Sequence, residues 1–274
     1  MRIAKTGNSR LTDCHNNKDV QENGEWFVRR ITLAILLALL APVSTQAADI
    51  TVYSPNIVNG PLQKLADAWT AETGNKVTLA GFNVGRVRAA VGKDDPGDVV
   101  LAPTAGFAEF APKLAPGSQR VLGRIPFGIV VKAGGAHPDI SSPEKFIAFV
   151  KKAGVLAYAD PKVGSLTGAM VEEMLKRPEF VGVEPRPIKG MIGDAIVRGD
   201  AEFGGGALTE ELMAKGADVV GPFPDEMGLH VDMSVAVLKV SAAPTEAEAF
   251  LRYITRPQSA AVWKAGGVIE TPVK

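Results

Sequence analysis

A glycine–arginine pair at positions 85 and 86 is the first feature of the chain whose residue types could do chemistry. It lies in "NVGRVRAAVGK", where the sequence predicts the start of a short helix. The first turn of a helix carries unpaired N–H groups and partial positive charge, so an arginine there is unfavourable unless an anion is present. Because the planar guanidinium suits a carboxylate, we expect Gly85 and Arg86 to bind one. The alternative is an arginine on an exposed helix turn.

Small polar residues follow two predicted strands. Ser54 and Asn56 come after "DITVY", and Thr104 comes after "DVVLAP". Ligands of open α/β sheets bind at the carboxyl ends of strands, so these side chains are candidates for ligand binding, with turn formation as the alternative.

A second group of candidates lies further along the chain. Ser165, Thr167 and Gly168 in "DPKVGSLTGAM" stand at a predicted helix start, where a hydroxyl can cap the helix or donate to an anion. Lys189 in "IKGMIG" is a candidate ligand cation, or else a solvated loop lysine.

Other chemistries find little support in the sequence. Lys plus Arg and Asp plus Glu number 30 each, which gives no reason to expect nucleic acid as a partner. After residue 47 the only histidines are His137 and His230, without metal-ligand spacing, so no metal or cofactor is expected. "GGG" at 204–206 lacks the context of a dinucleotide-binding fingerprint and indicates a close approach of two backbones or a ligand.

Alternating strands and helices must position these residues. Apolar runs predict strands and helical spacing predicts helices in a repeating order, which is typical of an α/β fold. The expected elements include strands at 49–55 and 124–134 and helices at 60–74 and, capped by Ser142, at 142–154.

The pattern restarts after 124–134, which predicts two lobes. Each is expected to be a mainly parallel sheet flanked by helices, with crossover strands near 127–131 and 233–237. Lobe I would comprise 48–127 with 233–274, and lobe II 128–232.

The N-terminus indicates export. Arg29-Arg30 and "ITLAILLALLAPVSTQA" have the pattern of a signal peptide cleaved after Ala47, and the apolar run is too short to span a bilayer. Residues 1–28 are polar and aperiodic, and we interpret them as a misassigned start, with the true one at Val28. Cleavage would remove Cys14, the one cysteine, and leave a soluble, monomeric periplasmic protein.

Several segments together resemble a known family. "ITVYSPN", "GDVVLAP", "AYADP", "GDAEFGGGALTEELMAKGADVVGPFP" and "FLRYITRPQSAAVWKAGGV" are similar to periplasmic solute-binding proteins of the molybdate-binding type. The resemblance implies two lobes that close on a small anion and deliver it to the membrane subunits of an ABC importer.

The family's pocket is altered in this chain. Its hydroxyl-bearing loops correspond to "YSPN" and to "NVGRV", which begins with Asn83. Its tyrosine position falls near Ala207, and Lys189 stands at the second-lobe helix start. Fewer hydroxyls and two more cations favour a di- or tricarboxylate over molybdate.

An isomerase on the same scaffold, like aconitate isomerase, is the competing hypothesis. It would shift a proton along a tricarboxylate and needs a base, for which His230, Tyr53 and Glu210 are the candidates. Because none of these is well placed in the sequence, we expect a binding protein rather than an enzyme.

Overall fold

The computed structural model describes residues 47–81 and 83–270. The predicted signal peptide, Cys14 and the proposed start at Val28 lie outside these residues. Among the residues described, no helix is long and apolar enough to cross a membrane.

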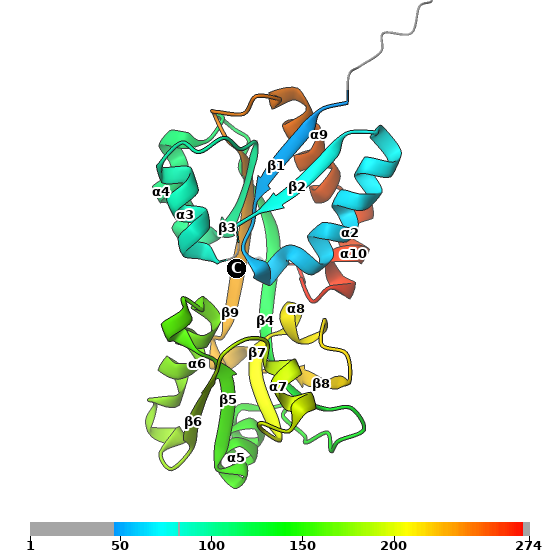
Figure 1. The fold of residues 1–274 in the computed structure, drawn as a ribbon. Helices are drawn as coiled ribbons and strands as arrows, with labels where there is room; N and C mark the ends of the chain where they lie inside the picture. The colour runs from blue at the N-terminus through cyan, green and yellow to red at the C-terminus, as the bar shows by residue number, and fades with distance from the viewer. Residues whose placement is uncertain (1–46, 82, 271–274) are drawn as a thin grey trace, which may run out of the picture. The chain divides into compact units, whose positions relative to one another are not determined.

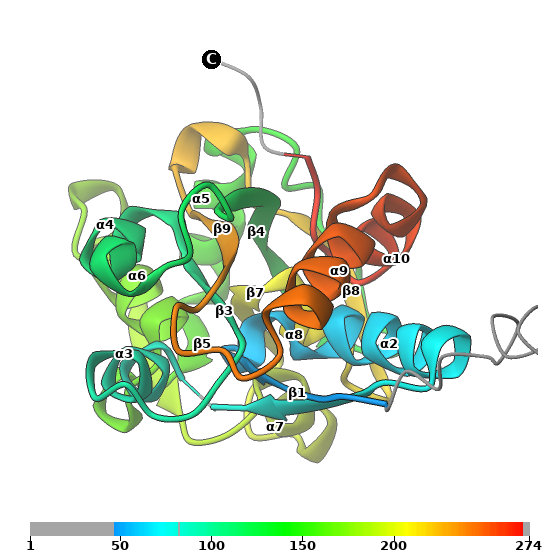
Figure 2. The ribbon, with the colours of Figure 1, turned by 90° about the horizontal axis from the view of Figure 1, so that it is seen from above.

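The first part of the fold is a three-stranded parallel group with β1 in the middle. Helix α2 lies along β2 and begins earlier than predicted, because Ile57 and Val58 are buried in the core (Figure 2). The helix ends at Gly74, as the sequence predicts, and this glycine adopts the left-handed conformation. The elements are β1 (Asp49–Tyr53), α2 (Asn56–Thr73), β2 (Lys76–Ala80), α3 (Val84–Gly92), β3 (Val99–Pro103) and α4 (Phe107–Phe110).

A second parallel group follows later in the chain, with β5 between β6 and β7. Ser142 caps α5 as predicted, since its side chain accepts a hydrogen bond from the Lys145 N–H. The elements are α5 (Pro143–Ala153), β5 (Val155–Ala159), α6 (Leu166–Leu175), β6 (Glu184–Ile188), α7 (Ile192–Arg198), β7 (Phe203–Ala207), α8 (Leu208–Glu211) and β8 (Ala217–Pro222).

Two antiparallel strands, β4 (Arg120–Lys132) and β9 (His230–Val237), join these groups, as can be followed in Figure 1. The first half of β4 pairs with β9, and its second half pairs with β7 and β8. Within the described residues the strand order is therefore β2-β1-β3-β9-β4-β7-β5-β6, with β8 on β4. The α/β class is confirmed, but the sheet is mixed rather than mainly parallel. The lobe boundaries stay a prediction.

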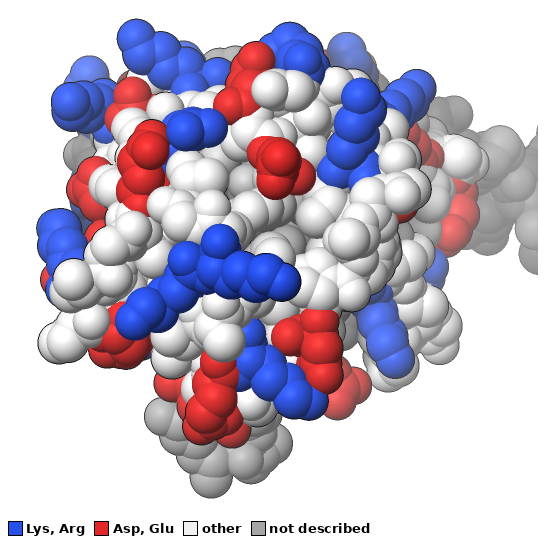
Figure 3. All heavy atoms as spheres, turned by 90° about the horizontal axis from the view of Figure 1, so that it is seen from below, with Lys and Arg blue, Asp and Glu red and all other residues white. Residues whose placement is uncertain are grey.

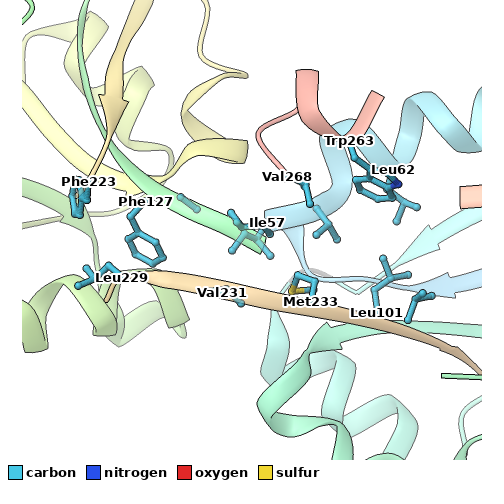
Figure 4. Close-up of a cluster of buried hydrophobic side chains, with 14 of the residues drawn as sticks. Ile57, Leu62, Leu101, Phe127, Phe223, Leu229, Val231, Met233, Trp263 and Val268 are labelled. Atoms are coloured by element: carbon cyan, nitrogen blue, oxygen red, sulfur yellow. The ribbon is translucent and has the colours of Figure 1, made fainter. Parts of the chain in front are cut away.

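Apolar side chains form a continuous core along β4 and β9. Figure 4 shows Phe127 and Phe223 at one end and Leu101 and Leu62 at the other, with Val231 and Met233 between. The last helices, α9 (Pro244–Thr255) and α10 (Ala260–Ala265), contact α2 and contribute Trp263 to this core. Burial of this apolar surface provides the main stabilisation of the fold.

Charged side chains of both signs are mixed on the surface. On the face shown in Figure 3, Lys and Arg alternate with Asp and Glu. In the described part of the chain, no group of three His, Cys, Asp or Glu residues is placed to hold a metal ion.

Candidate functional site

A pocket of about 410 Å³ lies where several helices begin. One side, which we call the N-terminal wall, is formed by the starts of α2 and α3. The other side, the C-terminal wall, is formed by the start of α6, the start of α7 and the β7–α8 connection. The N-terminal wall is lined by Pro55, Asn56, Ile57, Asn83 and Val84. The C-terminal wall includes Gly164, Ser165, Thr167, Met191, Gly206, Glu210 and Glu211.

The two walls approach each other closely. A Cβ on Gly164 would lie 3.5 Å from Asn83 Nδ2, on the opposite wall. Next to α8, Met213 Sδ lies 2.9 Å from the position of a Cβ on Gly60 of α2. A molecule in the pocket is therefore within reach of both walls.

Helix starts supply partial positive charge to the pocket lining without lysine or arginine. The N–H groups of the first turns of α2, α3 and α6 have no partner within their own helices, and they carry the positive end of the helix dipole. None of the lysine or arginine residues that the structure describes lines the pocket. Such an arrangement binds anions by N–H groups rather than by formal charge.

Two of these helix starts are capped by side chains and one is not. Asn83 Oδ1 accepts the Arg86 N–H at 2.9 Å, and Ser165 Oγ accepts the Gly168 N–H at 3.0 Å. Pro55 precedes α2 and makes no side-chain cap bond. The Val58 N–H donates to the Pro55 carbonyl oxygen at 3.1 Å, so the N–H groups of Asn56 and Ile57 are those that can bind a ligand.

Hydroxyl and amide groups add further donors. Ser165 Oγ and Thr167 Oγ1 are 3.1 Å apart, and only one of their two protons is used in that bond. The second proton can go to a ligand. Asn56 Oδ1 accepts from Asn59 at 3.3 Å, which leaves its Nδ2 to donate.

Two adjacent carboxyl groups, those of Glu210 and Glu211, complete the C-terminal wall. Glu211 is only 3 % exposed, and its Oε2 has no hydrogen-bond partner among the described residues. Burial raises the pKa of Glu211 to about 8, with the charges of Glu210 and Asp194 adding to the rise and the Gly193 N–H opposing it. Burial also raises the pKa of Glu210. A buried carboxyl that holds a proton near neutral pH can act as an acid.

Glycines on neighbouring elements make room for the Glu211 side chain. A Cβ on Gly206 of β7 would lie 2.4 Å from Glu211 Oε1. The sequence predicted an approach of two backbones or a ligand at "GGG", and the group that lies against Gly206 is instead this side-chain carboxyl. Gly204 and Gly205 instead face Ile192 and Phe223.

The predicted site residues fall into two groups. Asn56, Asn83, Ser165, Thr167 and Glu210 line the pocket, and Lys189 is an exposed residue between two lining residues. Arg86 and Gly85 are exposed and outside the lining, in the first turn of α3.

The other predicted residues are used within the fold. Ser54 is buried and donates to Asn59 at 2.6 Å, and Thr104 and Ser234 share a hydrogen bond of 2.8 Å. Gly168 packs on β5, because a Cβ there would lie 1.7 Å from the Ala159 carbonyl oxygen.

Two of the predicted bases also lie outside the pocket lining. The Tyr53 hydroxyl donates to the Pro96 carbonyl at 2.7 Å. His230 Nε2 lies 3.8 Å from Asp232.

Glu211 is not among the site residues predicted from the sequence. The available signal was the pair of acidic residues in "GGGALTEE", directly after a glycine-rich strand. The carboxyl end of a strand is a common ligand position, and burial of an adjacent acidic pair there shifts pKa values.

The chain matches known proteins over most of its length. The sequence profile of the family described as "Bacterial extracellular solute-binding protein" matches residues 50–268. Aconitate isomerase from a Pseudomonas species is 27 % identical over 260 residues, which cover 90 % of this chain and 99 % of that protein.

Solved structures share the fold. The substrate-binding domain of a putative molybdenum ABC transporter from Clostridium difficile has a TM-score of 0.66 at 13 % identity, covering 82 % of this chain and all of that one. The Azotobacter vinelandii periplasmic molybdate-binding protein has a TM-score of 0.63 at 18 % identity. The match covers 81 % of this chain and 100 % of the molybdate-binding protein. The resemblance predicted from the sequence is confirmed.

Proposed function

The chain belongs to the bacterial extracellular solute-binding protein family, and from that premise we propose that its pocket binds a small organic acid and shifts a proton along it. The proposed protein is a periplasmic isomerase acting on an unsaturated di- or tricarboxylate. The Pseudomonas relative, which carries the name aconitate isomerase and aligns over nearly its full length, supports this choice.

The observation that carries the proposal is the carboxyl group of Glu211. In a pocket that only captures anions, an ionised carboxylate such as that of Glu210 weakens binding, because it repels the ligand. Isomerisation, in contrast, requires a group that takes up and gives back a proton near neutral pH. Glu211 is buried and lines the same pocket as the helix starts, and within the described part of the chain its Oε2 has no hydrogen-bond partner.

The binding half of the proposal is supported by the helix starts. Backbone N–H groups of α2 and α6 and the Ser165–Thr167 hydroxyls can bind carboxylates from opposite walls. A volume of about 410 Å³ is within the range of small-molecule sites.

The same donors would assist the reaction. Removal of a proton from a carbon next to a C=C bond leaves negative charge that spreads onto a neighbouring carboxylate of the substrate. N–H groups fixed at helix starts stabilise that developing charge without reorganisation.

Proton NMR of the purified protein with trans-aconitate in D2O tests the proposal. We expect conversion to the isomer and deuterium in the product. Molybdate serves as the comparison ligand and should raise the melting temperature less than trans-aconitate does. Unchanged trans-aconitate together with a raised melting temperature would contradict the isomerase proposal.

Capture of an organic acid for an ABC importer is the second candidate. Family membership favours it, and so do the transport-related names of the structural neighbours. The sequence favours this function, because it offers cations but no well-placed base. The pocket lining of the described residues instead contains carboxyl groups and no cation, which favours the isomerase. Binding without conversion in the NMR experiment would support capture.

A further inference from the structure

We propose that Glu210 and Glu211 divide the proton shift between them, with Glu210 as the base at one carbon and Glu211 as the acid at the other. This inference rests on the proposed isomerase function. It names two catalytic residues and excludes a mechanism in which one residue removes and returns the same proton.

The placement of the two side chains supports this division. Both belong to the short helix α8, and both line the pocket. Adjacent residues of a helix project about 100° apart, so their carboxyl groups reach different positions along one ligand. An allylic proton shift needs proton-transfer groups at two positions, because the proton leaves one carbon and arrives at another.

The surroundings of the two carboxyl groups assign the roles. Glu211 is almost completely buried, between Gly206 and Gly193, whereas Glu210 is half-buried. Like charges in one site favour a state with a single shared proton, and that proton resides on the more buried group. The charge of Glu210 adds to the raised pKa of Glu211, so the two carboxyl groups interact within one site.

The reaction balances with these two groups alone. Glu210 takes a proton from the saturated carbon next to the double bond, and the C–H electron pair becomes the new C=C bond. The electrons of the old double bond take the proton of Glu211 at the far carbon. Glu210 is then protonated and Glu211 ionised, and transfer of one proton from Glu210 to Glu211 restores the starting state.

Two glutamine variants test the division, with trans-aconitate in D2O as the probe. Glu211→Gln retains the base but lacks the acid. We expect it to lose isomerisation by at least 100-fold while still exchanging the substrate's own C–H for deuterium. Glu210→Gln lacks the base and should lose both isomerisation and exchange.

Glu226→Gln is the matched control, because Glu226 is exposed and lies outside the pocket lining. It should isomerise like the unmodified protein. Trans-aconitate should still raise the melting temperature of both pocket variants, which establishes that they fold and bind.

The outcomes separate the inference from the function on which it rests. If the unmodified protein binds trans-aconitate without conversion, the proposed function fails. If it converts trans-aconitate and Glu211→Gln loses exchange as well as isomerisation, one residue does both steps and the division is wrong. The division is also wrong if either pocket variant isomerises normally. It is wrong too if the product of a single turnover in D2O, with the unmodified protein in excess over trans-aconitate, retains the substrate's original proton.

Discussion

The N-terminal and C-terminal walls of the pocket are built from the same kind of element but differ in what they contribute. Both present helix starts to the ligand. The N-terminal wall adds only amide side chains, whereas every titratable group among the described lining residues belongs to the C-terminal wall. Under the proposed function, both walls bind the ligand and only the C-terminal wall does chemistry. Substitutions on the first should change affinity, and substitutions on the second should change rate.

Glu211→Gln is expected to have the largest effect on the stability of the unliganded protein. Burial raises the pKa of this carboxyl from 4.5 in the unfolded chain to about 8 in the folded protein, so folding retains a proton that the unfolded chain releases. The unmodified protein therefore loses stability as pH rises from 4.5 to 8, by up to about 5 kcal/mol. Glutamine does not ionise and avoids this loss.

Urea unfolding at pH 5 and pH 9 measures this difference. The variant should be nearly as stable as the unmodified protein at pH 5 and clearly more stable at pH 9. If the variant and the unmodified protein are equally stable at both pH 5 and pH 9, Glu211 is not buried in the pocket wall. The C-terminal wall would then have no buried acid to distinguish it from the N-terminal wall.

Gly206→Ala should reduce isomerisation by roughly 100-fold, since displacement of a catalytic group by about 1 Å has an effect of that size. The new Cβ would lie 2.4 Å from Glu211 Oε1 and push the carboxyl aside. Gly92→Ala in α3 is the control, because a Cβ there meets nothing within 4 Å. Steady-state kinetics should show a lower kcat for Gly206→Ala alone. Similar kcat values for Gly206→Ala and Gly92→Ala would mean that the space at Gly206 of β7 does not affect the chemistry.

The capping side chains Asn83 and Ser165 lie on opposite walls, so their replacement allows the two walls to be compared directly. Asn83→Ala and Ser165→Ala should each lower the unfolding free energy by about 1 kcal/mol through loss of a helix cap. For Asn83→Ala we expect a higher KM with kcat unchanged, as for uniform binding. A large drop in its kcat would show that the N-terminal wall also takes part in the chemistry.

Arg86→Ala should have the smallest effect. Arg86 is exposed and outside the pocket lining, so the affinity for trans-aconitate should change by less than about threefold, as for a surface charge. The control is Arg88→Ala. Arg88 lies in the same helix as Arg86 and forms a surface ion pair with Glu109. A tenfold loss of affinity for Arg86→Ala alone, measured by calorimetry, would return Arg86 to the site predicted from the sequence.

Local signals made much of the fold predictable. Ser142 and Gly154 at the ends of α5 and Gly74 at the end of α2 are residues whose backbone or capping preferences act within a few positions. The mixed sheet was not predictable in this way, because the pairing of β4 with β9, β7 and β8 depends on contacts far apart in the sequence.

The same limit applies to the candidate site. Asn83 and Ser165 lie at helix starts that the sequence reveals, and they line the pocket. Ser54 and Thr104 also follow strands, but partners elsewhere in the fold bind their hydroxyls. Glu211 owes its burial to Gly206 and Gly193, and no local pattern shows that a glutamate near a strand end is enclosed by distant glycines.

The uncapped start of α2 has a consequence for local motion. Where α3 and α6 have Asn83 and Ser165, α2 has Pro55, so a bound carboxylate would be its first cap. Without ligand, the opening turn of α2 should fray more readily than those of the other two helices, and its amide hydrogens should exchange faster with solvent. Ligand should slow amide hydrogen exchange most at Ile57. Occupancy of the pocket can therefore be followed by the protection of the first turn of α2.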